Sequence, residues 1–93
     1  MTMSKGIAIR DVFKLSSGMT VLACDRPELD QVWRHKRVEL RSALGEARGG
    51  FMLVGERRMN GPSVNPSLLA VETAESVDLT SEEARSGNWR LDY

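Results

Sequence analysis

The sequence holds few of the residues on which small secreted domains and many enzymes depend. It contains one cysteine, Cys24, and one histidine, His35, among 93 residues. A single cysteine excludes an internal disulfide, and one cysteine with one histidine supplies too few ligands for a zinc site. No stretch approaches the roughly 20 apolar residues of a membrane-spanning helix. We therefore predict no metal, no cofactor and no membrane partner.

An excess of charge of one sign is lacking as well. The 13 Lys and Arg residues are balanced by 13 Asp and Glu residues, which argues against a simple polycation that binds nucleic acid. The balance is uneven along the chain: residues 1–58 hold 11 basic and 7 acidic side chains, a balance of +4, and residues 59–93 hold 2 and 6, a balance of −4. This pattern fits either an ordinary mixed surface or a basic face and an acidic face that steer a charged partner.

The length and the first residues of the chain predict one small cytoplasmic domain. A chain of 93 residues fits a single domain, 1–93, with a small core. The short apolar run at residues 7–9 is followed at once by Arg10 and Asp11, which come too early for the core of a signal peptide.

The first third of the chain predicts a β-hairpin. Apolar side chains recur with a period of two over residues 7–15, which is typical of a strand. Residues 16–18, Ser-Ser-Gly, have turn chemistry, and residues 19–24 are an apolar run of strand length.

Residues 25–44 allow two interpretations. As one long helix, they would begin at an Asp25 N-cap with Glu28 in a capping-box position and end at Gly45. Against this, Lys36 falls on the apolar face of that helix and Val38 falls off it. We favour a helical turn or loop near residues 27–32, followed by a strand over about 36–42.

The rest of the chain predicts further short strands separated by glycine and proline. The elements expected in order are a loop at 43–50, an apolar run at 51–55 extended to 59, a break at 60–66, a strand at 68–72, a short strand at 77–79, a helical turn at 80–86 stopped by Gly87, and a closing strand at 89–93. The whole pattern predicts a mostly β fold, a small antiparallel β-barrel of six to seven strands with one or two short helical turns.

This order of motifs resembles the second, β-barrel domain of translational GTPases of the elongation-factor-Tu type. Residues 11–22, DVFKLSSGMTVL, resemble its opening hairpin, residues 36–40, KRVEL, resemble a later strand, and residues 79–91 resemble its acidic helical turn and closing strand. The resemblance implies a barrel that contacts the ribosome and the aminoacyl end of tRNA, with the GTP machinery in another domain. The sequence departs from the family at residues 16–18, where the family has Gly-Arg-Gly, and it has no G-x-x-x-x-G-K-[ST] phosphate loop.

No constellation of residues predicts catalysis. Cys24 and His35 are the only candidates for a nucleophile and its base, but Cys24 ends an apolar strand, where cysteine behaves as a small hydrophobe. Glu82 and Glu83 are explained by their place at a helix start, where acids interact favourably with the helix dipole. We predict no catalytic residue and no enzyme.

The densest basic cluster is the sequence Trp-Arg-His-Lys-Arg at residues 33–37. Such cations can hold phosphates or acidic side chains, and Trp33 either stacks on a partner or fills the core. Arg57 and Arg58 alternate to opposite faces if their strand continues, so at most one joins the cluster. Trp89 and Tyr93 share the parity of a core strand, and residues 60–66 form either a recognition loop or a plain connector. The candidate partner-binding residues are Trp33, Arg34, Lys36, Arg37, Arg57 and Arg58.

The sequence predicts a non-enzymatic interaction module, a stand-alone small barrel that binds a macromolecule and no small-molecule substrate. A protein partner is favoured over RNA, because the net charge is zero and the cations are interleaved with acids. One specific form is a bacterial immunity or antitoxin-type protein. The alternative is an RNA- or ribosome-associated barrel, as the resemblance implies.

Overall fold

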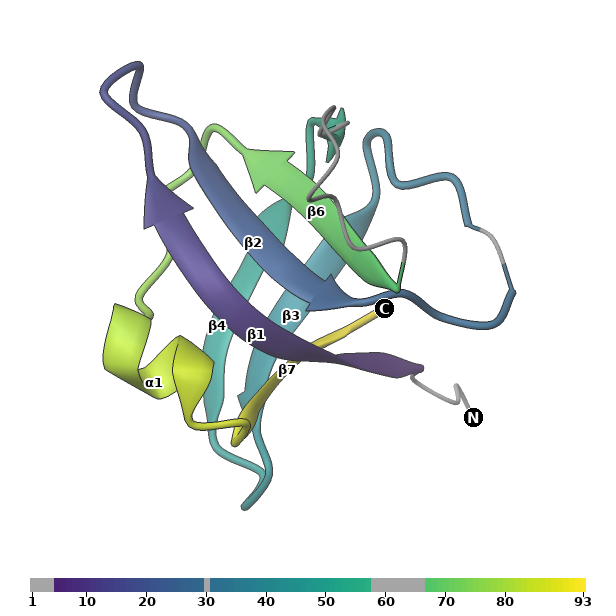
Figure 1. Ribbon diagram of the computed structural model, residues 1–93, viewed down its shortest axis with the longest axis vertical. Coiled ribbons are helices and arrows are strands. Elements are labelled where there is room, and N and C mark those ends of the chain that lie inside the picture. Colours follow the sequence, from purple (N-terminus) through teal and green to yellow (C-terminus); the bar gives the residue numbers. More distant parts are fainter. Residues whose placement is uncertain (1–4, 30, 58–66) are drawn as a thin grey trace.

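A computed structural model describes residues 5–29, 31–57 and 67–93 (Figure 1). Across these ranges the chain forms seven strands and one short helix, which confirms the predicted mostly β class. In chain order the elements are β1 (Gly6–Lys14), β2 (Thr20–Asp25), β3 (Arg37–Ser42), β4 (Ala47–Met52), β5 (Gly55–Glu56), β6 (Leu68–Thr73), α1 (Ser81–Arg85) and β7 (Trp89–Asp92).

The strands form one curled antiparallel sheet in the order β4-β3-β7-β1-β2-β6-β5. The two outermost strands, β4 and β5, follow each other in the chain, so residues 47–56 border both ends of the sheet. Beyond β5, the Arg57 N–H donates to the Ala70 carbonyl and prolongs the contact with β6. The predicted small antiparallel barrel is therefore confirmed, and one segment, residues 47–56, reaches from β3 to β6.

The predicted opening hairpin is confirmed. Phe13 pairs with Val21, and a bulge between Ile9 and Asp11 shifts the register. On the N-terminal side of this bulge, residues 6–8 of β1 pair with β7. The alternating apolar positions of the strands fill the barrel. The most buried of them are Ile9, Leu22, Cys24, Val38, Leu40, Leu69, Val71 and Leu91.

Of the two interpretations of residues 25–44, the long helix is wrong and the favoured strand is confirmed as β3. The alternation of β3 buries Val38 and Leu40, each 1% exposed, and leaves the charged residues Arg37 and Glu39 exposed. A helix would instead have brought Lys36 onto the apolar face. Asp25 ends β2 and does not cap a helix.

The predicted loop at residues 43–50 is confirmed for residues 43–46 and wrong for 47–50, because β4 already begins at Ala47. Of its three glycines, Gly45 lies in the turn, and Gly49 and Gly50 lie within the strand. Gly49 has a φ of +96° where the β3–β4 register shifts, and a Cβ on Gly50 would lie 3.0 Å from the Val38 carbonyl oxygen. Glycine therefore marks a bulge and a close approach of two strands here, not a loop.

The apolar run at residues 51–55 is a corner between two strands. β4 ends at Met52, whose carbonyl accepts from the Thr73 hydroxyl at 2.7 Å and whose N–H donates to the Glu75 carboxylate at 2.8 Å. β5 begins three residues later and pairs with β6. The two side-chain hydrogen bonds satisfy backbone groups that have left one ladder before the chain joins the next.

The short strand predicted at residues 77–79 is wrong, although Val77 and Leu79 are buried at 4% and 1% exposure. These residues lie in irregular chain before α1. The helical turn, its Thr80 cap, the positive φ of Gly87 and the closing strand are confirmed. The predictions for residues 60–66 fall outside the described residues.

Candidate functional site

The basic cluster lies on a tight turn that enters β3. The Lys36 N–H donates to the Trp33 carbonyl at 3.2 Å, and His35 takes a φ of +58°, in the left-handed region. Two further backbone hydrogen bonds join this turn to Leu53, from the His35 N–H at 3.0 Å and to the Lys36 carbonyl at 2.9 Å. The turn is thereby fixed to the corner between β4 and β5, so its side chains project from a rigid base.

Two aromatic side chains, Trp33 and Tyr93, pack beneath the Lys36 ammonium of the turn. Trp33 is 4% exposed, so its ring is not accessible for stacking on a partner, and the alternative that it fills the core holds. Its ring meets that of Tyr93 edge to face, with centroids 5.0 Å apart. The Lys36 ammonium lies over both rings, 6.0 Å from the centroid of Trp33 and 5.4 Å from that of Tyr93. Lys36 is therefore held in place by cation–π contacts, and no acidic side chain of the described residues pairs with it.

Ion pairs engage most arginines but not those of the cluster. The paired arginines within the described ranges are Arg10, Arg26, Arg41, Arg48, Arg57, Arg85 and Arg90. Arg34, Lys36 and Arg37 form no ion pair with any described residue. Lys5 and Lys14 are likewise unpaired there, but they lie apart from each other at the two ends of β1. The turn therefore gathers the only adjacent unpaired cations of the described chain.

The two halves of the chain do not form two separate charged faces. Four ion pairs cross the boundary between the basic half and the acidic half: Arg41–Asp92, Arg48–Glu83, Arg57–Glu72 and Asp11–Arg85. Mixing of the halves agrees with the ordinary mixed surface and not with two faces. What remains positive is local, at residues 34–37.

Arg57 differs from the cluster residues because its guanidinium donates to the Glu72 carboxylate at 3.1 Å. Arg58 lies outside the described residues. Sequence reasoning missed the exposed apolar side chains beside the cluster. Met52 is the direct cross-strand partner of Arg37 and is 42% exposed, and Val54 follows at 44%. The signal for Met52 was alternation within the predicted apolar run at residues 51–55, because its neighbour Phe51 is buried.

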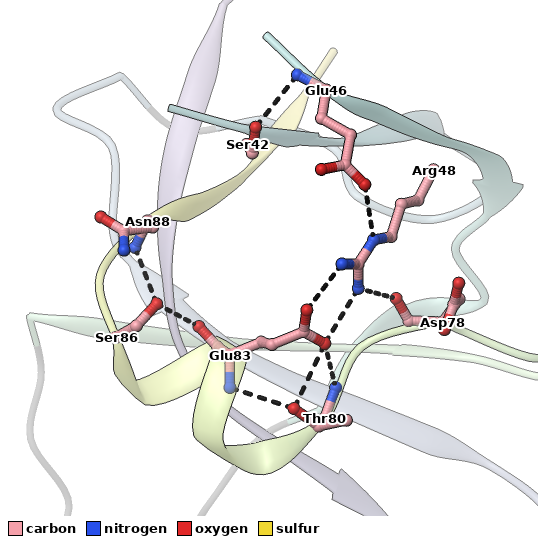
Figure 2. Close-up of polar contacts among 8 residues, drawn as sticks. All are labelled: Ser42, Glu46, Arg48, Asp78, Thr80, Glu83, Ser86 and Asn88. Atoms are coloured by element: carbon pink, nitrogen blue, oxygen red, sulfur yellow. Dashed lines mark hydrogen bonds and ion pairs between the residues drawn. The ribbon is translucent and has the colours of Figure 1, made fainter. Parts of the chain in front are cut away.

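A second polar cluster joins β4 to α1 through the hydrogen bonds of Arg48 (Figure 2). Arg48 points from β4 toward the helix start, where its two terminal nitrogens donate to the Glu83 carboxylate at 2.9 and 2.6 Å. It also donates to Glu46 and to the carbonyl of Asp78, and it lies 4.1 Å from the centroid of the Trp89 ring. With four of its five N–H donors engaged, Arg48 acts as a structural link.

Glu83 completes that cluster from the helix side. Its carboxylate accepts from the Thr80 N–H at 3.0 Å, and its own N–H donates to the Thr80 hydroxyl at 3.1 Å, a capping box. The Arg48 hydrogen bonds, followed by those of Thr80, lower the pKa of Glu83 to about 2. The expected role at a helix start is confirmed. The spacing of Thr80 and Glu83 was the signal for the box.

Cys24 and His35 are not brought together as a nucleophile and base. Cys24 lies in the core on β2, where burial, and then the nearby Asp25 charge, raise the pKa of its thiol to about 12. The thiol is therefore protonated at neutral pH, whereas the attacking species in cysteine chemistry is the thiolate. His35 is exposed on its turn.

The fold and surface together define a small antiparallel barrel with exposed apolar side chains beside a basic cluster that forms no ion pair within the described part of the chain. Comparison with protein-family models, with curated proteins and with solved structures found no match. The resemblance to the elongation-factor barrel therefore stays a prediction. Among the described residues no helix is long and apolar enough to cross a membrane.

Proposed function

We propose that this protein is a non-enzymatic interaction module whose barrel binds an acidic surface of a protein partner. The binding residues are Arg34, Lys36 and Arg37, with Met52 and Val54 beside them. The observation that carries the proposal is a set of adjacent cations that pair with no acid in ranges 5–29, 31–57 and 67–93 and lie on a turn fixed by backbone hydrogen bonds.

Charge supports this surface as a binding site. Three like charges held close together repel one another, and no described acid offsets them. An acidic partner removes that repulsion and is attracted over a distance, which raises its association rate. Because the turn is already ordered, little conformational entropy is lost on binding.

Composition favours a protein over RNA. Arginine and methionine are enriched in protein–protein interfaces, and Arg37 and Met52 are neighbours across two strands. Binding of single-stranded RNA usually adds stacking of bases on exposed aromatic rings. Trp33 and Trp89 are buried, so neither offers a ring to a base. An immunity protein, which covers a toxin, is one form of such a module.

The test uses two single charge reversals. The partner is cross-linked and isolated from the cell that makes this protein, then produced separately, and its affinity is measured by calorimetry. Arg37→Glu should weaken binding about tenfold, mostly through a slower association rate that depends on salt. The matched control is Lys14→Glu, which reverses an unpaired exposed charge at the far end of β1 and should leave the affinity unchanged. Equal affinities of the two variants would contradict the proposal.

An oligouridylate probe tests the RNA alternative. If the three cations of the cluster held phosphates, affinity should fall about 20-fold between roughly 50 and 200 mM salt. The loss of that salt dependence in an Arg34→Ala/Lys36→Ala/Arg37→Ala variant would favour RNA and replace the protein partner. Absence of RNA binding at low salt would leave the protein partner as the surviving proposal.

A further inference from the structure

The first residues of β1 present a strand edge that no described strand covers. Lys5 and Tyr93 exchange two backbone hydrogen bonds, at 2.9 and 2.8 Å. In an antiparallel ladder such pairs alternate, so Gly6 and Ala8 direct their N–H and C=O groups away from β7. On that side the pairing with β2 begins at Ile9, opposite Cys24. Cys24 turns its own N–H and C=O toward β6, so in this ladder the Ala8 carbonyl faces the Asp25 N–H. The N–H and C=O of Gly6 and the N–H of Ala8 are therefore left without a neighbouring strand among the described residues.

A cleft of about 560 Å³ lies along this edge. One wall is formed by residues 5–8 with Tyr93, and the other by residues 25–29. In Figure 1 the start of β1 and the end of β7 lie side by side, close to the long connection between β2 and β3. The volume falls in the range of sites that hold small ligands or short peptide segments. It offers space for a short extended segment beside β1.

The charges around the cleft differ from wall to wall. Lys5 lines the Tyr93 wall and has no ion pair with any described residue, and the Lys36 ammonium lies over the Tyr93 ring, 5.4 Å from its centroid, although Lys36 itself does not line the cleft. The opposite wall carries Glu28, which is exposed, and Leu29, which is 68% exposed. A carboxylate is therefore favoured on the Tyr93 side, and an apolar side chain is favoured against Leu29.

We propose that this cleft binds an extended segment of the protein partner as an added strand on β1, with an acidic side chain directed to Lys5 and Lys36. The inference rests on the proposed function, since it names how the partner is bound. Strand addition uses backbone hydrogen bonds for affinity and alternate side chains for specificity. The Tyr93 ring joins the cleft to the basic cluster, so one partner chain can occupy both.

The probe is a peptide selected on the intact protein from a random dodecapeptide library. We expect the selected peptides to contain Asp or Glu and to shift the backbone amide signals of Gly6 and Ala8 in NMR spectra. Methylation of each peptide nitrogen in turn should weaken binding about tenfold at the position that donates to the Gly6 carbonyl and not at its two neighbours, because only alternate N–H groups of an added strand face β1. Equal effects at those three positions, or failure to enrich any peptide, would overturn the proposal.

Charge reversals distinguish the cleft from the cluster. Lys5→Glu should weaken the peptide about tenfold, and Lys14→Glu should leave its affinity unchanged. A peptide in which the acidic residue is replaced by lysine should restore binding to the Lys5→Glu variant. If the partner responds to Arg37→Glu while the selected peptide is indifferent to Lys5→Glu, the proposed function stands and the added strand is wrong. If the Gly6 and Ala8 signals instead shift with the concentration of the protein itself, a second copy fills the cleft and the peptide proposal fails.

Discussion

Arg48 on β4 and Glu83 on α1 meet through two parallel hydrogen bonds of 2.9 and 2.6 Å, although 35 residues separate them in the chain. This pair attaches the only helix of the described residues to the barrel. The same guanidinium lies against the Trp89 ring of β7, so three elements converge on one side chain. The side of the barrel near α1 therefore depends on Arg48.

Replacing Arg48 by lysine should lower the thermal midpoint and the amide protection of Ala84. Lysine keeps the charge but not the planar fork that reaches both carboxylate oxygens, nor the flat face that lies on Trp89. The control is Arg57→Lys, whose arginine makes one 3.1 Å contact with Glu72. We expect the Arg48 variant to melt at a clearly lower temperature than the Arg57 variant. Equal midpoints would show that the paired geometry contributes nothing.

Acid should destabilise the protein partly through Glu83. Its pKa is lowered from 4.5 to about 2 in the fold, first by Arg48 and then by Thr80. A depressed carboxyl pKa stabilises the fold fully above pH 4.5, and this contribution is lost as the pH falls from there toward 2. Urea unfolding at a series of acidic pH values should therefore show a shallower loss of stability in Glu83→Gln than in the natural chain. Glu82→Gln, which changes an exposed neighbour, should keep the full acid slope.

The sequence was sufficient for the fold class because strand alternation is a local property. The alternation of Val38 and Leu40 identified β3, and the acids after Thr80 identified the helix start. Glycine was misread where its role is set by a partner strand. Gly50 is needed because the Val38 carbonyl lies close by, and that contact has no local signal.

The site was less predictable, because a cation's availability depends on residues distant in the chain. Arg34 and Arg57 both lie in basic stretches of the sequence, yet of the two only Arg57 forms an ion pair within the described residues, with Glu72 of β6. Trp33 lies in the basic sequence but points into the core, since the turn at His35 reverses the chain just after it. The cleft beside β1 has no sequence signal, because it lies where residues 6–8 pair with β7 and the pairing with β2 has not yet begun.

Cys24 should be inert in the folded protein. Its side chain is fully buried and its pKa is raised to about 12, so almost no thiolate is present at pH 8. Alkylation by iodoacetamide should therefore be at least about a thousandfold slower than in urea, because it requires opening of the barrel. Ser17→Cys in a Cys24→Ala background supplies an exposed thiol for comparison, which should react at once. Rapid alkylation of native Cys24 would contradict its placement in the core.

The backbone at His35 makes an opposite pair of predictions for two substitutions. Its φ of +58° is open to glycine, whereas a β-branched side chain is strained there by about 1–2 kcal/mol. His35→Gly should therefore change the free energy of unfolding by less than about 0.5 kcal/mol, and His35→Val should lower it by about 1–2 kcal/mol. Both variants keep the N–H that donates to Leu53. Arg34→Val places the same side chain one residue earlier, where φ is not positive, and should cost less than about 0.5 kcal/mol in urea unfolding. If His35→Val and Arg34→Val unfold at the same urea concentration, the left-handed turn under the basic cluster is wrong.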